Sequence, residues 1–487
     1  MPIYAIDVLY KKNIIVLQAY FIPAEEYNIM TRKSNNFLEK HFSSTMFTYK
    51  EILDMLFPLI LDMFFINAIN MLTTSMISSS SQASVAAVSM INPVTTLVLC
   101  LLNAIAAGGT VVVAQYKGKG IQSKINEASG HTLLITVGIS LIICTFMIIF
   151  ASPIVHILYG NAEPLVISKS VQYLAGSSVS LIIYSLYSAV FAIFRGLGET
   201  KICLNLTVYI NVSYFIFSYI FINILKLDIQ GTIIALILAR LLGSFVSIYH
   251  LFLKKNRMLY LKVKEVFAFN MQILRSMLKI SIPFGSEQLF FYGGSILVQK
   301  YMVALGTASI AANAIGTSLF SLAFAAPIAV GNLATTVIGQ CVGADKRDLA
   351  RWYGKKLIWL STGLLLISLV IFIPLIPWLM GFFNPEPNTI PLITRLLWIA
   401  IIPMPLFWPM SNVMPYTLRS AGDATYSSIV SLITMWLIRV GAGYIAAVPM
   451  GYGVEGVWVC MSLEWVLRTF LFWLRFRGKS WLSKQTI

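Results

Sequence analysis

Long apolar runs recur along almost the whole chain and limit it to a small set of folds. Of the 487 residues, 58% are hydrophobic and only 11% are charged. Many runs reach the roughly 20 residues that a helix needs to cross about 30 Å of hydrocarbon. A backbone inside a bilayer must satisfy its own hydrogen bonds, so only helices or closed barrels span it. Because the runs are continuous rather than alternating, they predict an all-α integral membrane protein.

The sequence also repeats itself at an offset of 225 residues. Pro58 corresponds to Pro283, and Asp62 corresponds to Glu287. Residues 83–87 correspond to 308–312, and Arg195 corresponds to Arg419 one residue out of step. Four more residues recur in the same order and spacing: Thr110, Val112, Gln115 and Gly118 in the first half, and Thr335, Val337, Gln340 and Gly343 in the second. Such a register indicates two halves built on one ancestral unit. In membrane proteins, duplicated halves usually move around a shared central site.

About twelve transmembrane helices are expected, six in each half. The expected spans are 50–76, 85–115, 130–152, 168–194, 202–225 and 231–253, followed by 278–300, 310–340, 355–380, 391–418, 427–449 and 454–475. Because six is an even number, both halves enter the membrane from the same side. The two repeats are therefore expected to be parallel, related by an axis along the membrane normal.

These spans predict a division of the chain into five segments. They are an N-terminal cytoplasmic segment at 1–48, an N-lobe at 49–253, a connector at 254–277, a C-lobe at 278–475 and a tail at 476–487. In the first segment, the apolar stretch 13–24 is too short to span a membrane, and it lacks a cleavage pattern. An interfacial helix, a disordered tail and a translation start at Met30 are the alternatives there, and no function is assigned to it.

Basic residues gather on one side of the predicted spans. The formal net charge is +16, and most of the 35 Lys and Arg residues fall in segments on the same side as the N-terminus. The densest group lies in the connector, whereas the loop at 78–82 on the other side has no charge. The positive-inside rule then predicts a multi-pass protein with both termini in the cytoplasm. The same rule explains the positive net charge, so no nucleic-acid partner is expected.

Two acidic residues fall inside predicted spans, where charged side chains are costly and usually functional. Asp62 and Glu287 each lie four residues after a proline and near the expected middle of the bilayer. A proline kink frees a carbonyl group beside the carboxylate. The carboxylate can bind Na⁺ together with neighbouring oxygens, or it can carry a proton because burial disfavours its charged form. Either chemistry couples an ion gradient to movement; a structural ion pair and a protonated packing residue are the alternatives.

Aromatic and amide side chains at mid-depth are candidates for a substrate cavity. The candidates are Tyr184, Tyr187, Gln288, Tyr292, Asn313 and Trp408. Ring faces such as those of Tyr184 and Tyr187 attract organic cations. Trp408 lies in the tenth span, which several prolines break, and broken helices line cavities in transporters. Interhelical hydrogen bonding and ordinary packing are the alternatives for this set.

Other ionisable and metal-binding residue types give few signals. Glu464 and Arg468 lie four residues apart on the last span and are expected to pair. The five cysteines form no CxxC pair and the four histidines form no spaced cluster, so no structural metal site or resident cofactor is predicted. A Na⁺ ion at Glu287 is the one metal ion expected.

Several stretches of the chain resemble the MATE (multidrug and toxic compound extrusion) transporters, most closely their bacterial branch. They are 107–118, 194–201, 282–288, and 305–313 together with 337–343. The resemblance covers roughly 50–475 and rests on the order and spacing of these stretches in both halves. It implies a twelve-helix, V-shaped, two-lobed exporter of the bacterial inner membrane. Such a protein expels organic cations and other amphipathic compounds in exchange for Na⁺ or H⁺, and is by default a monomer.

The resemblance also bears on the two intramembrane acids. An acid four residues after the proline of the seventh span is familiar in this branch, which supports Glu287. Many members carry an acid later in the first span, where this chain has the sequence Leu-Thr-Thr at 72–74, and another where Ser218 aligns. An acid found in the tenth span of some members is also missing. These departures place the expected coupling role on Asp62 and Glu287.

A flippase for lipid-linked precursors, or a metabolite exporter on the same superfamily fold, is the second hypothesis. A flippase would favour a cavity rich in Arg and Lys, and the sequence offers few candidates: Arg240, Arg439 and Lys300. A major-facilitator transporter is disfavoured because the loop after the second span lacks that family's pattern. There is no GxxxxGK[ST] motif for an ATP-driven pump and no paired catalytic motif for an enzyme. A channel suits duplicated halves around midplane acids less well.

Overall fold

The computed structural model describes most of the chain. The described residues are 39–40, 42–78, 81–160, 162–253, 259, 261–262, 266–267, 270–383, 385–484 and 487. The chain divides into two units, Met1–Asp54 and Met55–Ile487. The predictions for 1–38 and for most of the connector between 254 and 269 therefore lie outside the described residues.

In the first unit, the structure describes the approach to helix α3 (Tyr49–Ser78). The backbone N–H of Thr48 donates to Glu51 Oε2 at 2.8 Å, and the backbone N–H of Glu51 donates to Thr48 Oγ1 at 3.3 Å. This reciprocal arrangement is a capping box, which satisfies backbone donors that the first helical turn leaves unpaired. The sequence Thr-Tyr-Lys-Glu therefore fixes where α3 begins.

In the second unit, α3 from Met55 onward is followed by the remaining helices of the first repeat. They are α4 (Gln82–Lys119), α5 (Gln122–Ile149), the short α6 (Ala151–Tyr159), α7 (Pro164–Leu197), α8 (Thr200–Ser218) continued by η1 (Tyr219–Ile224), and α9 (Asp228–Ile248) continued by η2 (Tyr249–Leu253). The η segments are wider, π-type helical turns that prolong the preceding helix. Glycines in the left-handed conformation end α4 at Gly120 and α7 at Gly198.

The second repeat has the same order of helices with more interruptions. Its helices are α11 (Met271–Ala304), α12 (Thr307–Ala323) with α13 (Ala325–Gly343), α14 (Arg347–Phe383), α15 (Ile390–Ile401) with α16 (Met404–Ser420), α17 (Ala424–Thr434) with η3 (Met435–Ala442) and α18 (Gly443–Ala447), and α19 (Gly453–Arg477). The expected eighth span is thus interrupted at Phe324. The expected tenth span is broken before Met404, where Pro403 precedes the new helix.

Ten helices in the described part of the chain are long and apolar enough to cross a membrane. The pair α15 and α16, bent by 66°, makes an eleventh if it forms one span. α11 occupies the place of the expected seventh span but is not among these helices, and its sequence carries Glu287 and Gln288 at mid-length. Every expected span therefore has a helical counterpart in the expected order.

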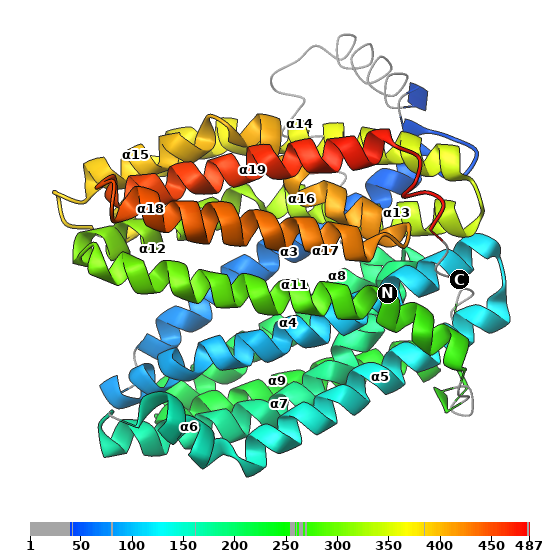
Figure 1. The fold of residues 1–487 in the computed structure, drawn as a ribbon. Helices are drawn as coiled ribbons and strands as arrows, with labels where there is room; N and C mark the ends of the chain where they lie inside the picture. Colours follow the sequence, from blue (N-terminus) through cyan, green and yellow to red (C-terminus); the bar gives the residue numbers. More distant parts are fainter. Residues whose placement is uncertain are drawn as a thin grey trace, which may run out of the picture. The chain divides into compact units, whose positions relative to one another are not determined.

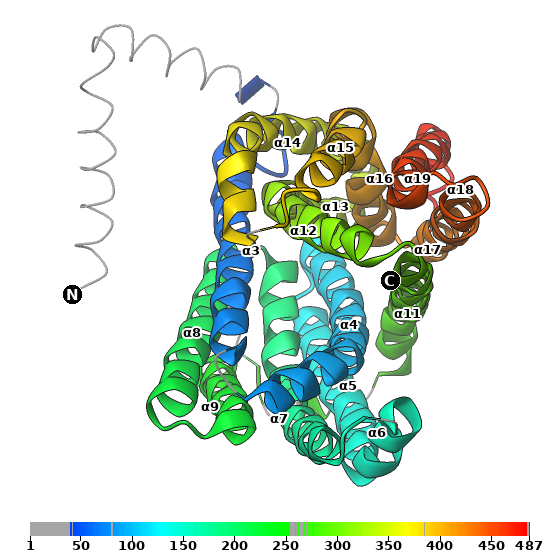
Figure 2. The ribbon, with the colours of Figure 1, turned by 90° about the vertical axis from the view of Figure 1, so that its left-hand side faces the viewer.

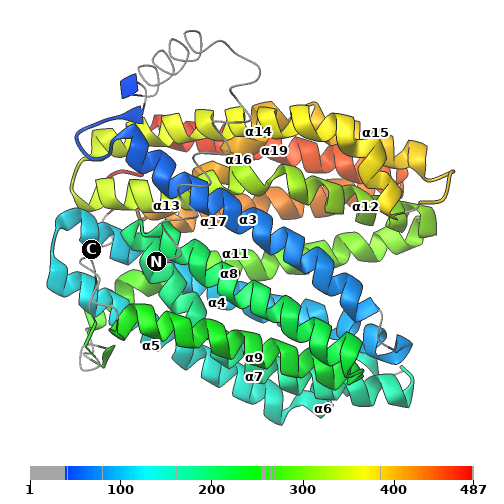
Figure 3. The same ribbon diagram turned by 180° about the vertical axis from the view of Figure 1, so that it is seen from behind.

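Two bundles make up the second unit. Figures 1 and 3 show α4 to α9 in one bundle and α12 to α19 in the other, with the long helices of each bundle running side by side. The view along the helices in Figure 2 shows α11 beside α4 at the edge of the first bundle. α11 packs against both α4 and α17, so the first helix of the second repeat joins the two lobes.

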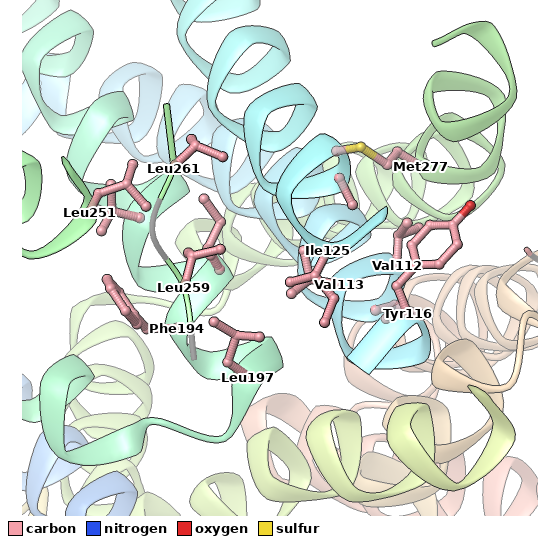
Figure 4. Packing of buried hydrophobic residues seen from close by; sticks show 14 of the residues in the cluster. Val112, Val113, Tyr116, Ile125, Phe194, Leu197, Leu251, Leu259, Leu261 and Met277 are labelled. Carbon is pink, nitrogen blue, oxygen red and sulfur yellow. The ribbon is translucent and has the colours of Figure 1, made fainter. Parts of the chain in front are cut away.

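An apolar cluster fixes that junction. Val112 of α4, Ile125 of α5 and Phe194 of α7 are buried in it. Met277 of α11 and Leu259 of the connector belong to the same cluster (Figure 4). The start of the second repeat is thereby anchored on the core of the first lobe, close to the ends of α4 and α7.

Candidate functional site

Repeat-related glutamines join the two lobes. Gln115 Nε2 of α4 donates to the carbonyl oxygen of Ser420, at the end of α16, at 2.8 Å. Gln340 Nε2 of α13 donates to the carbonyl oxygen of Gly196, near the end of α7, at 3.1 Å. Each glutamine reaches from one lobe to the other, and the two bonds run in opposite directions. They are therefore counterparts under the repeat.

Two glycines allow the backbones to meet at the same place. A Cβ added at Gly118 would lie 2.0 Å from the carbonyl oxygen of Gln340, and one added at Gly343 would lie 1.9 Å from that of Gln115. Real Cβ atoms do not approach backbone that closely, so glycine is required at both positions. We call Gln115, Gly118, Gln340 and Gly343 the cross-lobe seam. The repeat motif seen in the sequence is thus an interface between lobes.

Asp62 lies in the interior of the first lobe. Its side chain is 1% exposed, and neither carboxylate oxygen accepts a hydrogen bond from the described part of the chain. The Thr207 hydroxyl faces it as a hydrogen-bonding group, and the Arg195 guanidinium acts on it electrostatically. Thr207 shares a 3.0 Å hydrogen bond with Tyr187. Asp62 is therefore a buried carboxylate with no ion pair of its own.

Arg195 is directed instead toward the second lobe. It donates from Nη1 to Asn332 Oδ1 at 3.3 Å and from Nη2 to Thr110 Oγ1 at 3.4 Å. Its own carbonyl oxygen accepts a 2.7 Å hydrogen bond from the Thr336 hydroxyl. Arg195 thus links α7 of the first lobe to α13 of the second, beside the cross-lobe seam.

Glu287 has a more complete set of partners. Arg419 Nη2 lies 3.3 Å from Glu287 Oε2, and the Ser428 hydroxyl donates to the same oxygen at 2.8 Å. The guanidinium of Arg419 also stacks 3.7 Å from the ring centre of Phe284. Both partners of the ion pair are largely buried, at 6% exposure for Arg419 and 13% for Glu287. Glu287 is therefore held as an ion pair in this structure.

The two acid sites and the two arginines are counterparts under the repeat, but their pairing differs. In the second lobe Glu287 and Arg419 contact each other, whereas in the first lobe Asp62 and Arg195 do not form an ion pair. The cost of a buried charge without a partner is several kcal/mol. The acid and the arginine thus form an ion pair in the second lobe, whereas the equivalent acid and arginine of the first lobe do not.

Three cavities adjoin these groups. The central cavity, about 300 Å³, is bordered by Asp62, Arg195 and Arg419 among others. The C-lobe cavity, about 230 Å³, is bordered by Glu287, Arg419 and Arg468. The N-lobe cavity, about 520 Å³, is bordered by Arg240 and several tyrosines. The central cavity shares Phe284, Tyr416 and Arg419 with the C-lobe cavity, and Ile66, Tyr184 and Tyr187 with the N-lobe cavity.

Four of the six residues predicted to form a substrate cavity border these spaces. Tyr184 and Tyr187 lie between the central and N-lobe cavities, while Gln288 and Trp408 border the C-lobe cavity. The Trp408 ring stacks 4.5 Å from that of Phe324. The structure therefore divides this predicted set between the two lobes.

Tyr292 and Asn313 border none of the three cavities. The Asn313 side-chain oxygen accepts a 3.0 Å hydrogen bond from Trp458 Nε1, and the Tyr292 ring lies edge-on to that of Phe291. The Asn313 bond joins two helices, as in the interhelical packing that the sequence also allowed, whereas the rings of Tyr292 and Phe291 are neighbours on α11.

The sequence understated the number of arginines beside the cavities. Arg195, Arg419 and Arg468 border them together with Arg240, whereas Lys300 is exposed and Arg439 pairs with Glu464. A signal for Arg195 and Arg419 was present, because the repeat preserves both. In the sequence they stand out only as matching residues of the repeat, and nothing there indicates that they border a cavity.

A second buried ion-pair network lies behind the C-lobe cavity. Glu464 is fully buried, accepts a hydrogen bond from Arg439 Nε at 2.6 Å and pairs through its other oxygen with Arg468. Arg468 Nε donates to Thr434 Oγ1 at 3.2 Å. The predicted pairing of Glu464 with Arg468 is confirmed, with Arg439 as an additional partner.

Replacing Glu464 by Gln is expected to destabilise the protein strongly. The change leaves two arginines without a counter-charge, and breaking a buried ion pair costs about 3–5 kcal/mol. Glu455→Gln is the matched control on the same helix, because Glu455 pairs with Arg395 at the surface, where an ion pair contributes about 0–1 kcal/mol. Thermal unfolding in detergent would show a large drop for the first variant and little change for the second. Equal stability of the two variants would contradict the assigned network.

The model of one protein family matches the chain twice. The MatE model matches residues 58–220 and 283–445, the same spacing as the repeat found in the sequence. The chain belongs to the MatE family. MatE proteins are transporters rather than enzymes, and the resemblance seen in the sequence is thus confirmed.

MatE relatives match along most of the chain. "Uncharacterized transporter YisQ" of Bacillus subtilis is 26% identical over 420 residues, which are 84% of this chain and 90% of that protein. "Probable multidrug resistance protein NorM" of Thermotoga maritima is 22% identical over 423 residues, 86% of this chain and 89% of the other. The similarity to these relatives thus extends over most of both halves.

Solved MatE structures have the same fold. One is titled "Outward-facing conformation of a multidrug resistance MATE family transporter of the MOP superfamily". It matches with a TM-score of 0.82 at 18% identity, covering 90% of this chain and 97% of that one. The predicted all-helical, two-lobed, multi-pass membrane fold is confirmed.

Proposed function

We propose that this MatE protein is a secondary active exporter that moves amphipathic small molecules out of the cell in exchange for Na⁺ or H⁺. The observation that carries the proposal is the repeat-related pair of acid–arginine sites, Asp62 with Arg195 and Glu287 with Arg419, beside the three cavities. Intramembrane acids in such positions mark ion pathways in transporters. The proposed cargo class includes the organic cations that the family resemblance implies.

Asp62 is the better placed of the two acids to carry the coupling ion. A carboxylate buried without a partner is favourable only when a proton or a cation joins it. H⁺ would neutralise the carboxylate directly. Na⁺ would be coordinated by the carboxylate together with nearby oxygens such as that of Thr207. Glu287 already has Arg419 and Ser428 as partners, so an ion at Glu287 would have to release Arg419. We therefore assign Asp62 the primary role and Glu287 a role through its ion pair.

The orientation and assembly complete the proposal. The one-sided distribution of Lys and Arg supports a bacterial inner-membrane protein with both termini and the cross-lobe seam in the cytoplasm. In that orientation, a closed seam separates the cavities from the cytoplasm. Ion occupancy of Asp62 would shift the balance between seam-closed and seam-open states, which gives alternating access. The protein would act as a monomer without a resident cofactor.

Everted membrane vesicles that contain the protein test this function. Uptake of ethidium, a cationic dye, and of fluorescein, an anionic one, would be followed under an imposed Na⁺ gradient and, separately, an imposed pH gradient. One gradient is expected to drive uptake of at least one dye well above vesicles without the protein, and an ionophore for that ion should abolish it. Uptake that survives collapse of both gradients would overturn ion coupling.

The second candidate is a flippase or metabolite exporter on the same fold. One observation favours it: four arginines border the cavities, more than the sequence indicated. Arginine is suited to bind phosphate and carboxylate groups through two parallel hydrogen bonds. Gradient-independent movement of a pyrophosphate-linked lipid in the same vesicles would favour this candidate over the exporter.

A further inference from the structure

The N-lobe cavity has one charged group on its walls. At about 520 Å³ it is the largest of the three cavities and falls in the size range of small-molecule sites. Helices α4, α7, α8 and α9 supply most of its walls. Among its lining residues, all of which the structure describes, Arg240 is the only charged side chain. Tyrosines 173, 184 and 214 and the amides of Asn92 and Asn211 also border the space.

Arg240 has no carboxylate partner in the described part of the chain. Its Nη1 donates to the Ser180 hydroxyl at 2.6 Å, and its guanidinium lies 5.1 Å from the ring centre of Tyr184. Arg419, Arg439 and Arg468, by contrast, each pair with a buried glutamate. Arg240 therefore presents unused N–H donors and an uncompensated charge to a cavity.

We infer that the N-lobe cavity binds organic anions that carry an aromatic ring, with Arg240 pairing their carboxylate, sulfonate or phosphate group. The planar guanidinium can donate two parallel hydrogen bonds to such a group. The tyrosine rings offer faces and edges on which an aromatic body can stack. A bound anion would supply the counter-charge that the protein does not provide. The inference rests on the proposed exporter function only in taking this anion as cargo.

The charge of the neighbouring cavities favours the same class of ligand. Together the three cavities are bordered by Arg195, Arg240, Arg419 and Arg468, but by only two carboxylates, Asp62 and Glu287. Like charges close together in a desolvated space repel strongly. An organic cation in the N-lobe cavity would lie beside Arg240 without an acid to offset it, whereas an anion would be attracted. The cavity should therefore discriminate by the sign of the charge.

Two xanthene dyes of opposite charge provide a matched test. The full-length protein would be placed in nanodiscs of zwitterionic lipid, and binding of fluorescein, an anion, and rhodamine 123, a cation, would be measured by fluorescence polarisation. Fluorescein is expected to bind at least about tenfold more tightly, the effect of one hydrogen-bonded charge pair. Rhodamine 123 binding as tightly as fluorescein, or more tightly, would overturn the inference whatever the variants show.

Substitutions of Arg240 then test whether fluorescein binds in the N-lobe cavity. Arg240→Gln is expected to weaken fluorescein binding about tenfold or more, while Arg240→Lys, which keeps the charge but not the planar fork, should lose only part of the affinity. Arg395→Gln is the matched control, because Arg395 is exposed and pairs with Glu455 outside the cavities. Fluorescein binding that is unchanged in Arg240→Gln would place the anion elsewhere and overturn the inference.

This measurement is independent of coupled transport, because no ion gradient is present. Fluorescein binding through Arg240 in a protein that fails the vesicle assay would keep the anion site and overturn the exporter. Gradient-driven uptake of a cationic dye, without fluorescein binding, would keep the exporter and overturn the anion site.

Discussion

Asp62→Asn is expected to abolish ion-coupled export while the protein remains folded in the membrane. The asparagine amide matches the carboxyl group in shape but can neither bind a proton at neutral pH nor offer a negative charge to Na⁺. Because the Asp62 carboxylate forms no ion pair, its replacement breaks no direct contact of Arg195, which keeps its hydrogen bonds to Asn332 and Thr110. Export should fall to the level of cells without the protein, and the unfolding temperature should not fall. Dye efflux and thermal unfolding measure the two effects.

Asp54→Asn is the matched control for that variant. Asp54 lies two turns earlier on the same helix and is exposed, so the same chemical change should leave both export and stability unaltered. A fully active Asp62→Asn protein would reduce Asp62 to a packing residue. A variant that is inactive because it unfolds would assign Asp62 a structural role and remove the basis for the coupling proposal.

Gly343→Val is expected to prevent the cross-lobe seam from closing and thereby to stop transport. The added side chain would begin with a Cβ atom 1.9 Å from the carbonyl oxygen of Gln115. The contacted atom belongs to the Gln115 backbone, so no side-chain rotation can relieve the clash. The lobes should separate at this end, which leaves one half of the alternating cycle inaccessible. Gly118→Val should have the same effect, since its Cβ would meet the carbonyl oxygen of Gln340 at 2.0 Å.

Spin labels on exposed residues of the two lobes would report this separation. Labels at Lys119→Cys, at the end of α4, and Lys346→Cys, just after α13, should show one short distance in the parent protein and a longer one in Gly343→Val. Gly363→Val on α14 is the control, because nothing lies within 4 Å of a Cβ at Gly363. An unchanged label distance together with normal transport in Gly343→Val would contradict the role of the seam.

Much of the fold could be predicted because membrane helices are set by local properties. Apolar runs set the positions of the spans, and the 225-residue repeat sets their grouping, so each expected span has a helix in the right place. The interruption at Phe324 lies just before Pro327, which lacks the N–H that would bond to the carbonyl oxygen of residue 323, just as Pro403 lies directly before the new helix at Met404. Both the repeat and the spans were visible without knowing any contact between helices.

The candidate site was only partly predictable, because it depends on contacts between distant helices. The repeat singled out Asp62 and Glu287 as equivalent, yet only the structure shows that Glu287 pairs with Arg419 while Asp62 stays unpaired. Asn313 was selected for its polarity, but its partner Trp458 lies 145 residues away in the sequence. A single sequence gives the residue types, their depth and partners one helical turn apart, such as Glu464 and Arg468, but not partners on distant helices.

The central claim is that export is coupled to ion entry through Asp62, and ion movement in proteoliposomes tests it most directly. Vesicles that hold the purified protein and a pH- or Na⁺-sensitive dye would be loaded with the substrate that everted membrane vesicles transport. The account predicts that movement of the substrate in one direction drives one of the two ions in the other, and that Asp62→Asn abolishes this ion flux. The account would be contradicted if substrate crossed the membrane without movement of either ion, or if Asp62→Asn showed the same flux as the parent protein.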